Sequence, residues 1–292
     1  YTFLSERVKS QVKVPVTTSV RINTLKLAEE ILDNEQADLV SIGRPLIVDP
    51  ELPTKYKNGQ LDDIRTCIAC NQGCFDSLLN FKSVSCTYNA MVGHEGERPI
   101  VRTDKPKRVV VVGGGPAGME ASRVLALRGH HVTLYERNNQ LGGQLRYANV
   151  PPGREEILNI ITYLERQISK LKVNIKTGKE ADLQMLEKER PDAVIIATGG
   201  QPIMLNIPGI NGENVYIASD VLEGKASLGR EVVIIGGGTV GCEAALYVAK
   251  QGAMRPEVAC FLLKHNVLDA KDILEYTSKG NRNITLIEMK RK

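Results

Sequence analysis

The chain has 292 residues, of which 42% are hydrophobic and 25% charged, and its formal net charge is +4 at pH 7. These proportions are those of an ordinary globular protein with two or more domains. A positive charge this small does not indicate nucleic-acid binding, and no apolar run reaches the ~18 residues that a membrane-spanning helix needs. Six cysteines without a targeting segment predict reduced thiols and a cytoplasmic location.

The first 65 residues alternate short apolar strands with helices. We expect a helix over residues 3–12, a strand over 14–20, a helix over 25–34 and a strand over 37–43. Short strands separated by a helix of about ten residues form βα units, so the pattern predicts a parallel sheet. Because the chain starts without Met inside a helix and stops just after a strand, we expect it to be a fragment of a longer polypeptide.

Residues 66–100 show little periodicity and hold four cysteines. Cys67, Cys70 and Cys74 form C-x2-C-x3-C, and Cys86 follows after eleven residues. This spacing fits four thiolate ligands of one iron–sulfur cluster. A structural zinc with four cysteine ligands is the alternative, although such sites usually pair two C-x2-C knuckles. The other two cysteines, Cys242 and Cys260, are isolated and are expected to be buried or incidental thiols.

Residues 108–135 predict a strand, a glycine turn, a helix and a second strand. The turn is Gly113-x-Gly115-x-x-Gly118, and Glu136 ends the second strand 23 residues after Gly113. Such glycines let backbone N–H groups approach a pyrophosphate at the helix N-terminus, and the acid accepts hydrogen bonds from ribose hydroxyls. The residues assigned to this first dinucleotide site are Gly113, Gly115, Ala117, Gly118, Glu136 and Arg137.

Two further runs are expected beside the same dinucleotide. A buried strand over residues 192–196 ends in Ala197-Thr198-Gly199, which brings a second backbone turn close to the ligand. The Leu-Gly-Gly-Gln-Leu run over residues 141–145, through Gly143 and Gln144, would let the chain lie flat against a flavin ring. An ordinary surface turn is the alternative for this run.

The dinucleotide pattern recurs near the C-terminus. A strand over residues 231–235 is followed by Gly236-x-Gly238-x-x-Gly241, a helix and a strand that ends at Glu288. About 30 residues separate this helix from its second strand, and they predict two short helices of a surface insertion.

Together these motifs resemble the iron–sulfur flavoenzymes of the Old Yellow Enzyme superfamily, a group that includes 2,4-dienoyl-CoA reductase, 2-enoate reductase and trimethylamine dehydrogenase. The resemblance covers the whole chain in order, and the runs CIACNQGC and GGGPAGMEA carry it. It implies an α/β fold: the C-terminal end of a TIM (β/α)8 FMN barrel over residues 1–65, a 4Fe-4S segment over 66–100, a Rossmann-like FAD domain over 101–222 and a truncated NAD(P)H domain over 223–292.

The resemblance also assigns residues to FMN. Gly43 and Arg44 match the family's phosphate-gripping pair, and Arg21 lies in the run Ser19-Val20-Arg21-Ile22, where the family usually has Val-Gly-Arg-Ile. Because a β-branched residue resists the backbone angles that glycine permits, Val20 predicts either a different turn or a weaker phosphate grip.

The implied reaction carries electrons from NADH to FAD, then through the 4Fe-4S cluster to FMN, and finally to an activated C=C bond of an enoate or enoyl-CoA-type substrate. No residue of this chain is assigned as the proton donor of that reaction. Glu288 favours the ribose diol of NADH over NADPH, although Lys290 and Arg291 are close enough in sequence to reverse this in part. Arg65 and Asn71 flank the cysteines, and a charge or an N–H donor there is expected to raise the potential of the cluster.

Two other functions remain open. One is an amine dehydrogenase of the same architecture that passes electrons to a carrier flavoprotein. The other is a non-catalytic electron-transfer module similar to the small subunit of glutamate synthase, which has no FMN barrel. The intact second glycine loop favours the reductase over the amine dehydrogenase, and Gly43-Arg44 disfavours the module. The sequence predicts neither nucleic-acid nor membrane partners, and it does not determine the oligomeric state.

Overall fold

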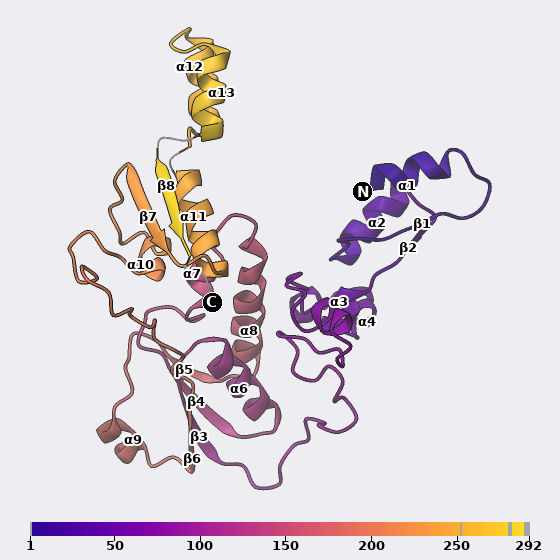
Figure 1. The fold of residues 1–292 in the computed structure, drawn as a ribbon. Helices are drawn as coiled ribbons and strands as arrows, with labels where there is room; N and C mark the ends of the chain where they lie inside the picture. Colours follow the sequence, from indigo (N-terminus) through magenta and orange to yellow (C-terminus); the bar gives the residue numbers. More distant parts are fainter. Residues whose placement is uncertain (1, 252, 280–281, 289–292) are drawn as a thin grey trace. The chain divides into compact units, whose positions relative to one another are not determined.

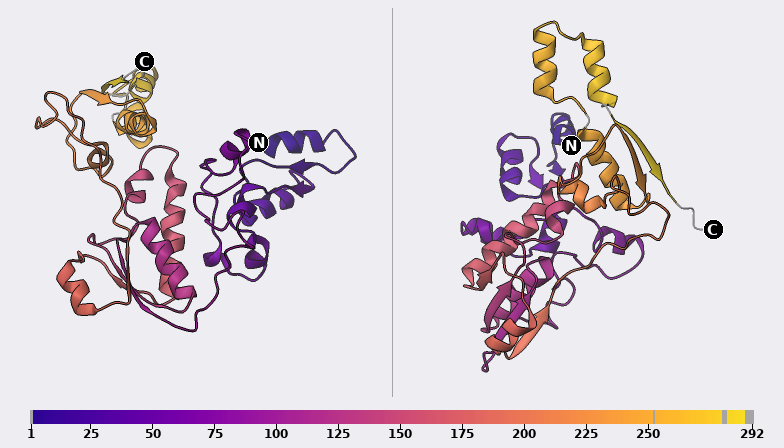
Figure 2. Two further views of the ribbon diagram at one scale, coloured as in Figure 1. Left: turned by 60° about the horizontal axis from the view of Figure 1, so that its bottom comes forward. Right: turned by 90° about the vertical axis from the view of Figure 1, so that its left-hand side faces the viewer.

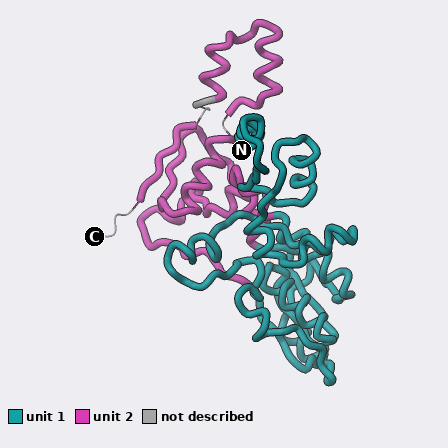
Figure 3. The backbone as a smooth tube through the Cα atoms, turned by 90° about the vertical axis from the view of Figure 1, so that its right-hand side faces the viewer, with its two compact units in different colours: residues 1–143, 158–198 teal, residues 144–157, 199–292 magenta. Residues whose placement is uncertain are grey.

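The computed structural model describes residues 2–251, 253–279 and 282–288. It divides into two compact units, one of residues 1–143 with 158–198 and the other of residues 144–157 with 199–292 (Figure 3). Lys290 and Arg291, which bear on the choice between NADH and NADPH, lie outside the described residues. No helix among the described residues is long and apolar enough to cross a membrane.

The first unit opens with two βα repeats. Their elements are α1 (Thr2–Lys9), β1 (Thr17–Thr18), α2 (Leu25–Asp33) and β2 (Leu39–Val40). Strands β1 and β2 pair in parallel, as predicted, but each has only two residues. Two features shorten β1, because Pro15 has no N–H to donate and Val20 leaves the extended region with a φ of 79°. Thr24 caps the N-terminus of helix α2, and its side chain accepts a 3.2 Å hydrogen bond from the Leu27 N–H.

A four-stranded parallel sheet forms the larger core of the same unit. Its order is β5-β4-β3-β6, from β3 (Arg108–Val112), β4 (His131–Tyr135), β5 (Asn174–Lys176) and β6 (Ala193–Ile196). Helices α6 (Pro116–Leu127) and α8 (Leu158–Lys170) pack against each other, and α6 also contacts β3 and β4 (Figure 1). Val111, Leu134 and Met119 are fully buried there. The predicted strand–turn–helix–strand unit is confirmed.

Between the βα repeats and this sheet the chain holds only short helices. They are α3 (Arg44–Val48), α4 (Leu52–Lys57), a 3-10 turn η1 (Leu61–Asp63) and α5 (Phe75–Leu79). Asp63 in η1 accepts 2.7 Å hydrogen bonds from Gln167 and Lys170 of α8. The hydrogen bond from Lys170 lowers the pKa of the Asp63 carboxyl. These contacts fasten the segment that precedes the cysteines to the four-stranded sheet domain. Helix α9 (Leu183–Glu189) precedes β6.

The second unit repeats the strand–helix–strand pattern. Parallel strands β7 (Glu231–Ile235) and β8 (Asn283–Ile287) flank α11 (Thr239–Gln251) in sequence. The predicted insertion is a pair of helices, α12 (Pro256–Lys264) and α13 (Ala270–Lys279), which lie side by side (Figure 2). The unit also contains α7 (Leu145–Ala148), the 3-10 turn η2 (Glu155–Ile157) and α10 (Ala218–Leu222).

Candidate electron-transfer site

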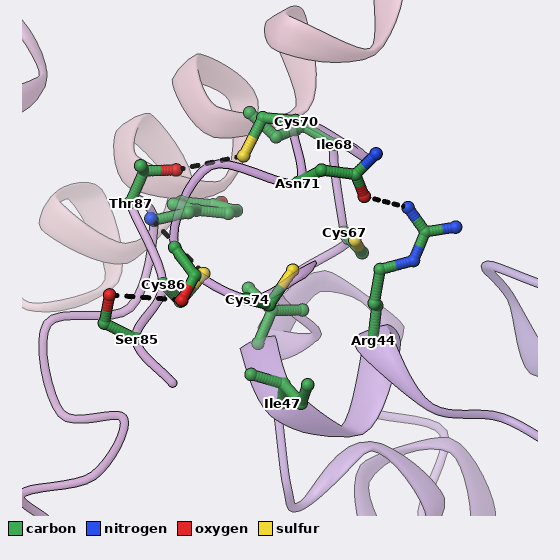
Figure 4. Close-up of a pocket in the computed structure, with 13 residues that line it drawn as sticks. Arg44, Ile47, Cys67, Ile68, Cys70, Asn71, Cys74, Ser85, Cys86 and Thr87 are labelled. Atoms are coloured by element: carbon green, nitrogen blue, oxygen red, sulfur yellow. Dashed lines mark hydrogen bonds between the residues drawn. The ribbon is translucent and has the colours of Figure 1, made fainter. Parts of the chain in front are cut away.

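The four cysteines of the N-terminal third line one small cavity of about 20 Å³ (Figure 4). Cys67, Cys70 and Cys74 come from a single loop, in which Ala69 and Asn71 have left-handed φ angles of 53° and 61°. Those two residues fold the loop back on itself, so that three side chains spaced along the chain reach the same cavity. The predicted set of four thiols is therefore gathered in one place.

Cys86 reaches the cavity through a close backbone contact. The Ser85 N–H donates a 2.6 Å hydrogen bond to the Gly73 carbonyl. A Cβ atom on Gly73 would lie 2.7 Å from the Ser85 carbonyl oxygen, so only glycine allows this approach. The contact places Cys86 next to Cys74 although eleven residues separate them in the sequence.

Hydrogen bonds orient three of the thiols. Cys67 Sγ accepts from the Ala69 N–H and Cys86 Sγ accepts from the Tyr88 N–H, each at 3.4 Å. Cys70 Sγ lies 3.2 Å from Thr87 Oγ1. Burial raises the pKa of the Cys67 thiol, against smaller lowering effects from the Ala69 N–H and the charge of Arg44. N–H donors aimed at sulfur stabilise thiolate, the form of cysteine that binds metals.

The donor set suits a metal centre, although the sulfurs do not converge on one point. In the described part of the chain no group of three or more His, Cys, Asp and Glu side chains is arranged to hold a metal ion. The cavity has room for about one water molecule. Four thiols gathered at one cavity are the ligands that an iron–sulfur cluster uses, so the residues suit a cluster by their chemistry. That fit does not rest on the size of the space between them.

Arg65 connects the thiol segment to the helices of the four-stranded sheet domain. It is only 7% exposed, and its guanidinium carbon lies 5.4 Å from the Tyr88 ring centroid and 5.0 Å from that of Tyr163. Glu120 of α6 approaches Arg65 Nη2 at 3.6 Å and is also bound by Arg123. A cation between two rings and beside a carboxylate is well stabilised even when buried.

A second cavity of about 380 Å³ adjoins the thiols. Its lining includes the residues expected to hold FMN, namely Arg21, Gly43 and Arg44. Val20 and Arg21 have consecutive φ angles of 79° and 59°. The first of the two outcomes predicted for Val20, a different turn, is therefore not what the structure shows: the turn keeps a left-handed backbone suited to glycine, and a valine adopts it at the cost of backbone strain. The weaker phosphate grip stays a prediction. Arg44 also donates a 2.6 Å hydrogen bond from Nη1 to Asn71 Oδ1.

The first glycine loop has the geometry of a dinucleotide-binding turn. A Cβ on Gly118 would lie 1.9 Å from the Gly113 carbonyl oxygen, so a side chain at this position would separate the helix from the turn. Glu136 is buried, and its carboxylate accepts a 2.7 Å hydrogen bond from the Gly114 N–H. Ala117 lies exposed in the first turn of α6, and Arg137 is exposed beyond β4.

The two runs expected beside this loop differ in what they contact. A Cβ on Gly113 would lie 2.3 Å from the Ala197 carbonyl oxygen and 3.1 Å from the Thr198 nitrogen, and one on Gly143 would lie 3.0 Å from Gly115 Cα. Both runs therefore approach the loop within the first unit. Gln144 belongs to the second unit, where its side chain donates a 2.8 Å hydrogen bond to the Gly200 carbonyl next to Gly199.

The second glycine loop reproduces the first. A Cβ on Gly241 would lie 1.8 Å from the Gly236 carbonyl oxygen. Glu288 accepts a hydrogen bond from the Gly237 N–H, as Glu136 does from Gly114. Gly238 is exposed at the start of α11. Cys242 and Cys260, which the sequence left as buried or incidental, are both exposed.

The sequence pointed to Arg65 but not to its partners. Tyr88, Tyr163 and Glu120 come from three separate segments, and although Glu120 lies in the run GGGPAGMEA, no spacing rule pairs any of them with Arg65. The apolar spacing along α8, where Tyr163 is buried, is the one signal that could have placed this ring toward the core. The carbonyl of Asn159 accepts a 3.4 Å hydrogen bond from the Tyr88 hydroxyl, which anchors the ring.

Comparison with known proteins agrees with this geometry. Residues 107–291 match the pyridine nucleotide-disulphide oxidoreductase family and residues 2–63 match the NADH:flavin oxidoreductase / NADH oxidase family. The pair of matches defines an oxidoreductase that uses flavin and pyridine nucleotide cofactors. The chain belongs to the iron–sulfur flavoenzyme family of the Old Yellow Enzyme type.

Several relatives are similar over nearly the whole chain. A metal reductase of Desulforamulus reducens is 41% identical over 99% of this chain and 44% of its own length. A cinnamate reductase of Clostridium sporogenes is 38% identical over 90% of this chain and 39% of its own. A solved structure of a 2-naphthoyl-CoA reductase has a TM-score of 0.83 and 35% identity over 98% of this chain and 44% of that one. The chain thus spans less than half the length of each of these three relatives.

We predict that Val20→Gly stabilises the protein by about 1 kcal/mol, because glycine relieves a left-handed φ that costs a β-branched residue about 1–3 kcal/mol. The side chain is 56% exposed, so little buried area is lost. Urea unfolding followed by circular dichroism measures the change. Val14→Gly is the control: Val14 is 67% exposed and is absent from the residues with positive φ, so that change should destabilise. An equal effect of both substitutions would contradict the strain.

We predict that Arg65→Ala lowers the free energy of unfolding by about 2 kcal/mol, because two cation–π contacts and one ion pair are lost from a buried site. Arg166→Ala is the matched control, since Arg166 is half exposed and forms a surface ion pair with Asp62. Its loss should stay within about 0.5 kcal/mol. Equal losses for both variants would show that the stack of Arg65 between the rings contributes nothing.

Proposed function

We propose that this chain carries the electron-delivering part of an NADH-dependent flavin and iron–sulfur reductase that acts on activated C=C bonds. The observation that carries the proposal is the gathering of four cysteine thiols next to a cavity lined by Arg21 and Arg44. The relatives named for reduction of cinnamate and naphthoyl-CoA support a small-molecule substrate of the enoate or enoyl-CoA type.

Cys67, Cys70, Cys74 and Cys86 are proposed to ligate a 4Fe-4S cluster. The C-x2-C-x3-C spacing with a fourth cysteine after eleven intervening residues supports a cluster over a single zinc ion, because zinc sites with four cysteine ligands usually pair two C-x2-C knuckles. The N–H groups of Ala69 and Tyr88 would then hold two of the thiolates in place.

The first glycine loop is proposed to bind FAD through the N–H groups of residues 113–118. Glu136 is held by Gly114 and faces the loop, where its carboxylate can accept from the ribose. The second loop is proposed to bind NADH in the same manner, with Glu288 as the ribose acceptor. Gly43, Arg44 and Arg21 are proposed to hold the phosphate of FMN.

Domain assignments follow from these sites. We propose a barrel end over residues 1–65, a cluster segment over 66–100, an FAD domain over 101–222 and a nicotinamide domain over 223–292. Bound flavins and the cluster supply hydride and single-electron transfer, while the chain positions them. Its own residues would bind phosphates at the loops, orient ribose hydroxyls through two carboxylates and hold the four thiols around one cavity. Arg65, two residues from Cys67, places a buried positive charge that would favour the reduced state of a bound cluster.

The deciding experiment is a metal and flavin analysis of the chain produced and purified without oxygen. We expect about four iron and four acid-labile sulfide per chain together with both FAD and FMN. Cys86→Ser should lose most of the iron, whereas Cys260→Ser, which changes an exposed and isolated thiol, should keep it. A zinc-loaded product without sulfide would overturn the proposal.

The flavin content separates the alternatives. The reductase should hold FMN and FAD, an amine dehydrogenase FMN with ADP, and an electron-transfer module FAD alone. Reduction of the flavin by NADH under anaerobic conditions supports the reductase, and reduction by a secondary or tertiary amine with no response to NADH favours the dehydrogenase.

Glu288 provides a test of nucleotide choice. We predict that wild-type chain binds NADH more tightly than NADPH, because the carboxylate repels a 2′-phosphate. Glu288→Gln should reduce this preference about tenfold, measured as the ratio of the two dissociation constants. Glu231→Gln, at the opposite end of the same strand pair, is the control and should leave the ratio unchanged. A wild-type preference for NADPH would refute the assignment.

A further inference from the structure

Arg44 forms part of the wall between the two cavities. Together with Ile47 and Cys74 it lines both the thiol cavity and the 380 Å³ cavity. Figure 4 shows its guanidinium extending from the start of α3 to Asn71, which lies between Cys70 and Cys74 in the sequence. One side chain therefore borders two candidate redox sites.

The bond to Asn71 engages only part of the guanidinium. Arginine has five N–H donors in a planar fork, and the 2.6 Å bond uses Nη1. The remaining donors can bind a phosphate oxygen, for which the fork geometry is well suited. The same cavity is lined by Arg21, Ser19 and Ser41 among mostly apolar residues, so its polar members suit an anion.

Asn71 is built into the cysteine loop by its backbone. Its φ of 61° is the left-handed conformation that Asn tolerates better than most residues. The Asp76 N–H donates a 3.0 Å hydrogen bond to its carbonyl, which fixes it against the start of α5. The hydrogen bond from Arg44 to the Asn71 side chain therefore links the position of Arg44 to the loop that carries three of the thiols.

We propose that Arg44 is a positioning residue shared by the two sites, so that a phosphate group in the larger cavity and the charge of the thiol-bound cluster compete for the same cation. The inference rests on the proposed function. It concerns how the two sites influence each other, and not which cofactor each site binds.

The sign of the coupling follows from charge. One-electron reduction adds a negative charge to the thiol site, which draws Arg44 toward Asn71 and adds repulsion to an anion in the neighbouring cavity. Phosphate therefore binds the reduced protein more weakly than the oxidised one. By linkage, bound phosphate must lower the reduction potential by the amount that corresponds to this ratio of phosphate affinities.

The experiment measures the midpoint potential of the cluster in the anaerobically purified wild-type chain, stripped of FMN, with and without saturating inorganic phosphate. A fivefold difference in phosphate affinity between the oxidation states corresponds to a decrease of about 40 mV, from 59 mV per tenfold for one electron. The reference measurement uses a chloride buffer of equal ionic strength that contains neither phosphate nor sulfate. A potential that does not respond to phosphate would overturn the inference.

Two variants at one position locate the effect. Asn71→Gly removes the side chain while glycine accepts the φ of 61°, so the loop keeps its backbone and the potential shift should fall below half. Asn71→Asp keeps an acceptor for Arg44 and should retain the shift. An undiminished shift in Asn71→Gly, in protein with unchanged iron content, would contradict a role for this bond.

A third measurement does not need the cluster. Calorimetric titration of the iron-free chain with inorganic phosphate should show about threefold tighter binding for Asn71→Gly than for wild type, because Arg44 is released to the anion, and much weaker binding for Arg44→Gln. If the chain holds no iron, the proposed function fails while this titration still decides whether Arg44 is shared. Equal affinities for wild type and Asn71→Gly would refute the sharing.

Discussion

The hydrogen bond between the Ser85 N–H and the Gly73 carbonyl closes the segment on which the candidate site depends. Thiols in the Cys67–Cys74 loop and on Cys86 share a cavity only because two backbones meet with no side chain between them. The loop holding the first three thiols is itself turned by left-handed residues at 69 and 71. Few regular elements support this region, so the backbone turns, and not a core, place the sulfurs.

A region without its own core has to be held from outside, and Arg65 does so. It brings the ring of Tyr88, two residues after Cys86, against Tyr163 of α8, while its guanidinium reaches Glu120 of α6. The two rings meet edge to face with centroids 5.8 Å apart. Asp63, which precedes Arg65 by two residues, also binds α8 through its hydrogen bonds with Gln167 and Lys170. The thiol segment is thus fastened to the helix that begins at the first glycine loop.

Sequence patterns predicted the elements and motifs of this chain better than the contacts between them. The run RVVVV and the glycine turn after it predict β3 and α6 because burial and turn geometry act locally. The pairing of Arg65 with Tyr163 and Glu120 joins residues from three segments, and no spacing rule reaches that far. Val20 shows another limit: its residue type left the turn undecided, and only the surrounding loop makes a valine adopt a backbone suited to glycine.

The two glycine loops show what the dinucleotide pattern requires. The acid follows the first glycine by 23 residues in one loop and by 52 in the other, because α12 and α13 lie between helix and strand in the second. The geometry is nevertheless the same in both loops. The third glycine packs so closely on the carbonyl of the first that a Cβ would not fit, and the carboxylate accepts a hydrogen bond from the N–H of the residue after the first glycine. Parallel pairing of the two strands brings the acid to the loop whatever the length of the connection. The sequence spacing is therefore a consequence of the short first connection, whereas strand register and glycine contact are the physical requirements.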